Sequence, residues 1–155
     1  SLALDLKSAD DRAKLAPLLA RADVLVEQFR PGVMARLGLD YASVSRDNPR
    51  IVYCSITGYG SDGPLAQVPG HDIDYLARSG VLGAVSGDGE RPAIPLNVVA
   101  DFAGGGLYAA FAIMVALFHR ERSGEGQRID LAMTDGALSL LTSRCVGCHG
   151  AFRIR

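Results

Sequence analysis

The sequence predicts an α/β fold, in which helices cover a parallel β-sheet. Two features of the chain carry this prediction: short apolar, β-branched segments alternate with segments of helical periodicity, and the spacing between them matches that of βαβ units. The composition agrees, because 48% of the 155 residues are hydrophobic and 21% are charged. A chain with this balance is long enough to form one domain with a hydrophobic core.

Charge and hydropathy exclude several classes of protein. The chain carries 16 basic and 17 acidic residues, so we expect no general binding to nucleic acid. The longest apolar run, Leu107 to Phe118, is shorter than the roughly 20 residues that a membrane span requires, so we expect no membrane partner. The first residues show no export signal, and an odd number of cysteines fits a reducing compartment. We therefore expect a cytoplasmic protein.

In the first third of the chain, strands and helices alternate. Ser8 with Asp11 three residues later is typical of a helix N-terminus, and leucines then recur at helical spacing through Arg21. The clearest strand, 51–56, is β-branched and lies between Pro49 and Gly58. Altogether we expect strands over 2–6, 22–27 and 51–56, and helices from Ser8 to Arg21, over 33–37 and over about 40–47.

The rest of the chain contains more turn formers. Residues 58–64 are expected to form an exposed loop at the carboxyl end of a strand, where open α/β sheets bind ligands. A helix with an acidic first turn is expected near residues 72–79. Further turn-rich connections are expected over 86–92 and 123–126, and a final helix begins near Thr134.

Asp101 lies at the most distinctive point of the chain. It ends the apolar run 98–100, which we expect to be extended, and Gly104, Gly105 and Gly106 then lead into the expected helix over 107–118. Glycines allow close approach of a ligand, and a helix N-terminus favours negative charge. Aspartate is also a preferred helix cap, and from spacing alone capping is the more common role than catalysis.

Four blocks of sequence resemble the family III CoA-transferase superfamily, and within it the α-methylacyl-CoA racemase branch. They cover residues 27–38, 48–60, 70–75 and 101–106 and occur in the family's order within residues 2–140. The resemblance implies an acyl-CoA-handling enzyme that forms an interlocked homodimer. It also implies a coenzyme A thioester as substrate, with no metal or redox cofactor.

The resemblance further implies a Rossmann-like large domain and a smaller second domain. Because such enzymes are much longer, we expect residues 1–130 to be part of the CoA-binding large domain, without its opening strand. We expect residues 131–155 to begin the linker towards the small domain, which would bear a glutamate that orients the catalytic histidine. A truncated remnant without catalytic activity is therefore one alternative.

His71 and Asp101 match the two catalytic bases of the racemases. Racemisation of a 2-methylacyl thioester removes the α-proton from one face and returns a proton to the other, which requires two acid/base groups on opposite sides. The resulting enolate oxygen would be stabilised by backbone N–H groups of the glycine-rich turn. The second alternative is a family III CoA transferase, in which Asp101 acts as a nucleophile.

Further residues are expected to contact coenzyme A. Arg36 matches a CoA-contacting position of the family, and Arg30 is a weaker candidate of the same kind. Tyr75 would share the helix face of His71 and line the CoA channel, although a packing role fits its position nearly as well. Gly104 and Gly105 are assigned to the same binding site. Asp72 and Asp74 are interpreted as complements to a helix dipole.

A second motif is interpreted as coincidental. Cys145 and Cys148, followed by His149, satisfy the pattern for covalent haem attachment. We expect no haem, because the chain shows neither an export signal nor a convincing second axial ligand. Cys54 and His119 offer no helpful spacing for a zinc site.

Overall fold

The computed structural model describes residues 1–85 and 91–141, and it contains a parallel three-stranded sheet in the order β1-β2-β3. The strands are β1 (Val24–Glu27), β2 (Val52–Thr57) and β3 (Gln127–Ala132). Val52 of β2 pairs with Val24 on one side and with Gln127 on the other. The predicted α/β class is therefore confirmed, as are the strands expected over 22–27 and 51–56.

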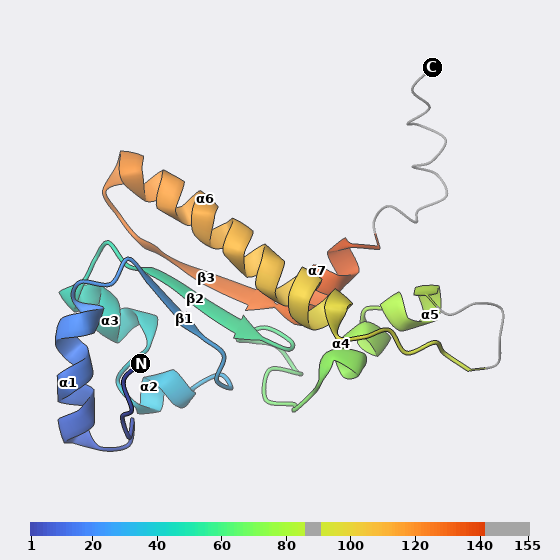
Figure 1. The fold of residues 1–155 in the computed structure, drawn as a ribbon, viewed down its shortest axis with the longest axis horizontal. Helices are drawn as coiled ribbons and strands as arrows, with labels where there is room; N and C mark the ends of the chain where they lie inside the picture. The colour runs from blue at the N-terminus through green and yellow to red at the C-terminus, as the bar shows by residue number, and fades with distance from the viewer. Residues whose placement is uncertain (86–90, 142–155) are drawn as a thin grey trace.

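Three helices pack on one face of the sheet: α1 (Ala9–Leu19), α2 (Val33–Arg36) and α3 (Tyr41–Asp47) (Figure 1). Their apolar side chains form a core with β2, in which Tyr53 is buried and donates a hydrogen bond to the Leu39 carbonyl at 3.0 Å. Ser8 caps α1 by accepting from the Asp11 N–H, as its position predicts. These helices confirm the prediction for this part of the chain.

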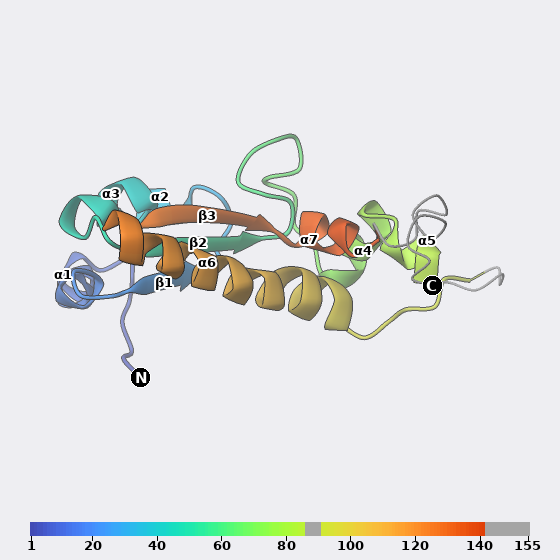
Figure 2. The same cartoon turned by 90° about the horizontal axis from the view of Figure 1, so that it is seen from above.

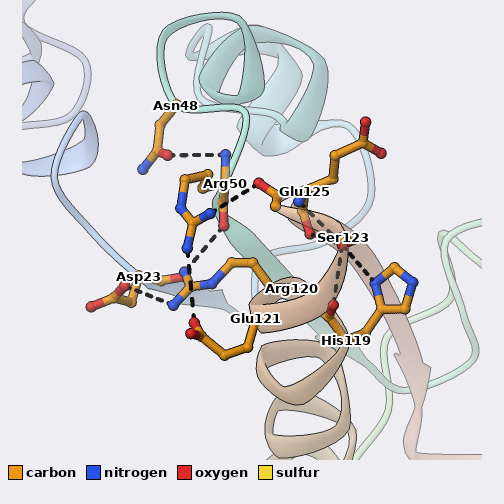
Figure 3. Close-up of polar contacts among 9 residues, drawn as sticks. Asp23, Asn48, Arg50, His119, Arg120, Glu121, Ser123 and Glu125 are labelled. Carbon is orange, nitrogen blue, oxygen red and sulfur yellow. Dashed lines mark hydrogen bonds and ion pairs between the residues drawn. The ribbon is translucent and has the colours of Figure 1, made fainter.

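The other face of the sheet is covered by α6 (Tyr108–Ser123). The helix contacts β2 and β3, and its buried side chains include the small Ala109 and Ala116. Near the end of α6, Arg120 is buried and donates from Nη1 to the Asp23 and Arg50 carbonyls and from Nη2 to Asp23 Oδ1 (Figure 3). This arginine therefore fixes α6 to the amino ends of β1 and β2.

A second group of helices lies beyond the carboxyl ends of the strands (Figure 2). It comprises the π-helix η1 (Val98–Leu107), α4 (Asp72–Arg78), α5 (Val81–Val85) and α7 (Met133–Ser139). These helices share their own apolar cluster, centred on Leu76, Ala100 and Ala137, each of which is fully buried. The sheet and this cluster together hold the segments that carry His71 and Asp101.

The strand expected over 2–6 is wrong. No strand is present over these residues, because side chains of α1 take up their backbone groups. Arg12 Nη1 donates to the Leu6 and Lys7 carbonyls at 2.8 and 2.9 Å, and Asp5 N donates to the Asp11 carboxylate at 2.9 Å. The segment is therefore a turn that leads into α1.

The extended segment expected over 98–100 is also wrong. These residues form the first turn of η1, which continues directly into α6, so Asn97 rather than a residue after the run occupies the N-cap position. Asp101 consequently lies inside the first helical turn and does not cap the helix. The alternative of a capping aspartate is therefore excluded by this geometry.

The continuous helix formed by η1 and α6 is longer than the apolar run over 107–118 that the sequence analysis considered. Val98–Ser123 spans 26 residues and meets the length and composition of a membrane-crossing helix, with 22% of its most apolar window buried. Core helices of soluble proteins meet the same criterion, and the α6 part of this helix contacts β2 and β3. Its exposed large apolar side chains, which we call its exposed apolar face, are Val98, Phe102, Leu107, Phe111, Met114, Val115 and Phe118.

The domain boundary expected after residue 130 falls inside β3. The strand ends at Ala132, and α7 then packs closely on η1, where Gly136 and Gly104 bring two helix backbones together. The assignment of residues 131–155 to the start of a linker towards a small domain stays a prediction.

Candidate active site

A cavity of about 580 Å³ lies at the carboxyl ends of β1 and β2. Open α/β sheets bind ligands at this edge, as the sequence predicts for the loop after β2. Its walls come from the segment after β1, the loop between β2 and α4, the start of α4, η1 and the first residue of α7. His71, Asp101, Tyr75 and Arg30 all line it, although they come from distant parts of the chain.

His71 is exposed in the cavity wall at the N-cap position of α4. Its backbone is held by Asp74: His71 N donates to Asp74 Oδ2 at 2.9 Å, and Asp74 N donates to the His71 carbonyl at 2.9 Å. This reciprocal pair satisfies N–H groups at the helix start. Asp74 therefore has a local helix-starting role, in agreement with its interpretation from the sequence.

Asp101 is half-buried in the first turn of η1 and also lines the cavity. Its N–H donates to Asp72 Oδ2 at 2.8 Å, and the preceding Ala100 N–H donates to the same oxygen at 3.1 Å. Burial raises the pKa of Asp101, and the Asp72 charge raises it further, whereas His71 and a hydrogen bond with Asn97 lower it. A carboxyl group with a raised pKa is better suited to exchange protons near neutral pH.

Tyr75 lines the cavity and also packs against its neighbours, and its contact with coenzyme A stays a prediction. It lines the cavity, but its ring is buried and packs edge to face on Tyr59 with centroids 5.2 Å apart. Its hydroxyl donates to the Gly70 carbonyl at 2.6 Å, and burial raises its pKa. Tyr75 therefore holds the loop before His71 in place while forming part of the wall.

The two arginines differ in their relation to the cavity. Arg30 is exposed and lines it, next to Pro31. Arg36 is exposed at the end of α2, where its guanidinium lies over Gly32, and it is not among the residues that line the cavity. Contact with coenzyme A stays a prediction for both side chains.

The glycine-rich turn expected before α6 is not formed. Gly104 and Gly105 are buried within η1, and a Cβ on Gly104 would lie 2.7 Å from the Ala137 nitrogen. A Cβ on Gly105 would lie 3.1 Å from the Met133 side chain. Residues inside a helix use their N–H groups for its own hydrogen bonds. The CoA-binding and enolate-stabilising roles assigned to these glycines therefore lack geometric support, and we assign them to helix packing.

Two residues of the site were missed by the sequence analysis. Asp72 was interpreted only as a complement to the dipole of its own helix, yet its carboxylate binds the start of η1. Asn97 lines the cavity and hydrogen-bonds the Asp101 side chain. Residues four positions apart are neighbours on the surface of a helix, so a helix over this segment would have predicted the contact between Asn97 and Asp101. The contact was not predicted because we expected the segment to be extended.

No group of three or more metal-ligating side chains occurs within residues 1–85 and 91–141. Cys54 is buried in β2, where burial and the nearby Glu27 and Asp130 charges raise the pKa of its thiol to about 11. His119 lies on α6, as expected. The Cys145 to His149 motif lies outside the described residues.

Comparison with known proteins identifies the family. Residues 1–152 match the model of CoA-transferase family III. The chain belongs to this family. As a family III chain, it is 49% identical over 140 residues to mouse alpha-methylacyl-CoA racemase, which covers 90% of the chain and 37% of that protein. It is 42% identical over 142 residues to acetyl-CoA:oxalate CoA-transferase of Acetobacter aceti, which covers 91% and 36%.

Solved family III structures share the fold. A CAIB/BAIF family protein from Brucella suis matches with a TM-score of 0.85 and 35% identity over 96% of this chain and 39% of that chain. The chain therefore spans a little over a third of the length of the relatives that it matches.

Proposed function

We propose that the complete protein is a 2-methylacyl-CoA racemase in which His71 and Asp101 are the two acid/base groups. One observation carries the proposal: both side chains line the same cavity, His71 from the start of α4 and Asp101 from the start of η1. Racemisation requires this kind of pair, because the proton leaves one face of the α-carbon and returns to the other. The identity with the mouse racemase supports the same assignment.

The reaction would proceed in two proton transfers. One base removes the α-proton, and the electron pair of the broken C–H bond moves into the thioester carbonyl to give an enolate. The protonated partner then donates its proton to the opposite face, which restores the carbonyl and inverts the centre. For one enantiomer His71 is the base and Asp101 the acid; for the other the roles are exchanged. The raised pKa of Asp101 favours its acid role in the first direction.

The cavity wall offers surfaces of two kinds for an acyl-CoA. Arg30 provides a guanidinium suited to phosphate recognition, and Arg36, six residues further along the chain at the end of α2, lies outside the cavity wall. Phe29, Phe102 and Met133 provide apolar wall for the branched acyl group. We also propose that the complete protein is a homodimer and that the exposed face of α6 becomes covered there.

A family III CoA transferase is the second candidate, favoured by the accessibility of the Asp101 carboxylate from the cavity and by the 42% identity to the Acetobacter aceti enzyme. Here the carboxylate would attack the thioester carbonyl and expel CoA as its thiolate, leaving a mixed anhydride. The thiolate would then attack the aspartyl carbonyl, releasing the first carboxylic acid and forming an aspartyl-CoA thioester. A second carboxylate would finally take the CoA.

Deuterium exchange separates the two reactions. The complete protein is incubated with a 2-methylacyl-CoA in D2O, with and without an added carboxylic acid. A racemase incorporates deuterium at the α-carbon without the acid and interconverts the enantiomers, and either Asp101→Asn or His71→Ala lowers the rate of interconversion by at least about 100-fold. CoA transfer to the added acid without α-exchange would instead establish the transferase. Native-like secondary structure with neither reaction in the 155-residue chain, while the complete protein exchanges the α-proton, would identify the chain as a non-catalytic remnant.

A further inference from the structure

Asp72 connects the two candidate bases through the backbone. It follows His71 directly in the chain, and its Oδ2 accepts hydrogen bonds from the Ala100 and Asp101 N–H groups at 3.1 and 2.8 Å. Asp72 is 29 residues from Asp101 in sequence, so the contact joins α4 to η1. One residue therefore spans the gap between the peptide unit of His71 and that of Asp101.

This contact satisfies groups that the helix itself leaves unpaired. The first N–H groups of a helix have no partner within it, and Ala100 and Asp101 lie in the first turn of η1. Hydrogen bonds from N–H groups to a carboxylate are stronger than those between neutral groups, and two of them fix the backbone direction. They consequently limit where the Asp101 carboxyl group can point in the cavity.

A structural helix contact alone does not explain the place of this carboxylate. Asp72 is half-buried and its negative charge lies beside a second carboxyl group, which is unfavourable unless the arrangement is held by other contacts. The titratable groups that act on Asp101 are Asp72, in the first turn of α4, and His71, at the N-cap of that helix, and the Asp101 charge in turn raises the pKa of Tyr75. Asn97, on its own segment, hydrogen-bonds its side chain.

We propose that Asp72 is a positioning residue for proton transfer, which holds Asp101 at the distance and direction from His71 that the substrate α-carbon requires. The inference rests on the proposed racemase function. Asp72 does not need to touch the substrate; it acts through the Asp101 backbone and through its charge.

Two substitutions separate position from charge. Asp72→Asn keeps an oxygen that accepts the two N–H groups but removes the negative charge, whereas Asp72→Ala removes both. We expect Asp72→Ala to lower kcat for α-proton exchange about 10- to 100-fold with KM changed less than about threefold, because a misplaced base affects the chemical step. Asp72→Asn should retain more than about a third of kcat.

The pH profile provides a readout that a purely structural role would not move. Removal of the Asp72 charge lowers the pKa of Asp101, so the acidic limb of kcat/KM should move to lower pH in Asp72→Asn, for the enantiomer that uses Asp101 as base. The matched control is Ser8→Ala, which removes the cap of α1 away from the cavity. It should lower thermal stability without altering the rate or the pH profile.

The outcomes distinguish the two hypotheses. If the unsubstituted complete protein exchanges no α-proton, the proposed function is overturned, and the Asp72 role in proton transfer with it. If the unsubstituted protein exchanges protons but Asp72→Asn leaves the pH profile in place and a folded Asp72→Ala retains its kcat, only the positioning role is overturned. Because Asp72→Asn retains the hydrogen bonds, it keeps the test decisive even where Asp72→Ala does not fold.

Discussion

Arg120 Nη2 donates to Asp23 Oδ1 at 2.9 Å and joins residues that are 97 positions apart in the chain (Figure 3). The arginine side chain is 8% exposed, but that of Asp23 is 77% exposed. A partner so open to water contributes little by charge alone. The hydrogen bonds from Arg120 to the Asp23 and Arg50 carbonyls therefore carry most of the contact.

Arg120→Ala is expected to lower the free energy of unfolding by about 2 kcal/mol, because it removes the charge-assisted hydrogen bonds that the buried guanidinium donates to the Asp23 and Arg50 carbonyls. Arg122→Ala is the matched control: this exposed arginine lies over the Phe118 ring, and its loss should cost less than about 0.5 kcal/mol. Urea unfolding of both variants checks the difference. Equal losses would show that the buried contact does not anchor α6.

Gly104→Ala is expected to destabilise the protein by about 2 kcal/mol or more. Its Cβ would lie 2.7 Å from the Ala137 nitrogen, and a helix backbone cannot give way cheaply. Gly106→Ala, in the same helix, would meet only ordinary contact at 3.7 Å from the Asp101 carbonyl and should be neutral or stabilising by up to about 1 kcal/mol. Thermal unfolding distinguishes this packing role from a binding role, in which both variants would keep their stability.

The raised pKa of Asp101 makes a prediction about stability and pH. A group that binds its proton more tightly in the folded state stabilises the fold at low pH, and this contribution is lost as the pH rises through the folded pKa. Asp101→Asn should therefore lose less stability than the unsubstituted protein between about pH 4 and pH 7. Denaturant unfolding across this range measures the effect, with Asp62→Asn in an exposed loop as control. Parallel curves for all three proteins would refute the prediction.

The isolated 155-residue chain is expected to self-associate, because α6 exposes a row of large apolar side chains. Phe111 is 68% exposed and Met114 is 64% exposed. Replacing both with Ser should lower the apparent mass at micromolar concentration, whereas replacing the exposed Glu121 with Ser should not. Light scattering coupled to size exclusion measures this. A monodisperse monomer of the unsubstituted chain would contradict the expectation.

The sequence predicted the elements whose signals are local. The strand β2 is β-branched and bounded by turn formers, and α1 has a serine cap, so neither depends on distant residues. The prediction of an extended segment over 98–100 was wrong because a three-residue apolar run does not distinguish a strand from the first turn of a helix. The prediction of a strand over 2–6 was wrong for a different reason. Its alternating pattern is that of a strand, but the Arg12 side chain binds the Leu6 carbonyl in place of a neighbouring strand.

The site was predictable only in part for a related reason. His71 and Asp101 were selected by their match to a family, since nothing in their spacing brings them into one cavity. The contact of Asp72 with the start of η1 depends on the packing of α4 against that helix, which no local pattern encodes. The packing role of Gly104 likewise depends on Gly136, which lies in α7, a helix that follows much later in the chain.

The wide turns of η1 determine the angular phase between Asp101 and the sheet-facing side of α6. In an α-helix each residue advances the side chain by about 100° around the axis, whereas a π-helix closes its hydrogen bonds one residue later and turns more slowly. The same residues wound as an α-helix would rotate the Asp101 carboxylate around the axis relative to α6, which contacts β2 and β3. The direction in which the Asp101 carboxylate points into the cavity therefore depends on the rotation per residue of η1 as well as on the identity of the residue.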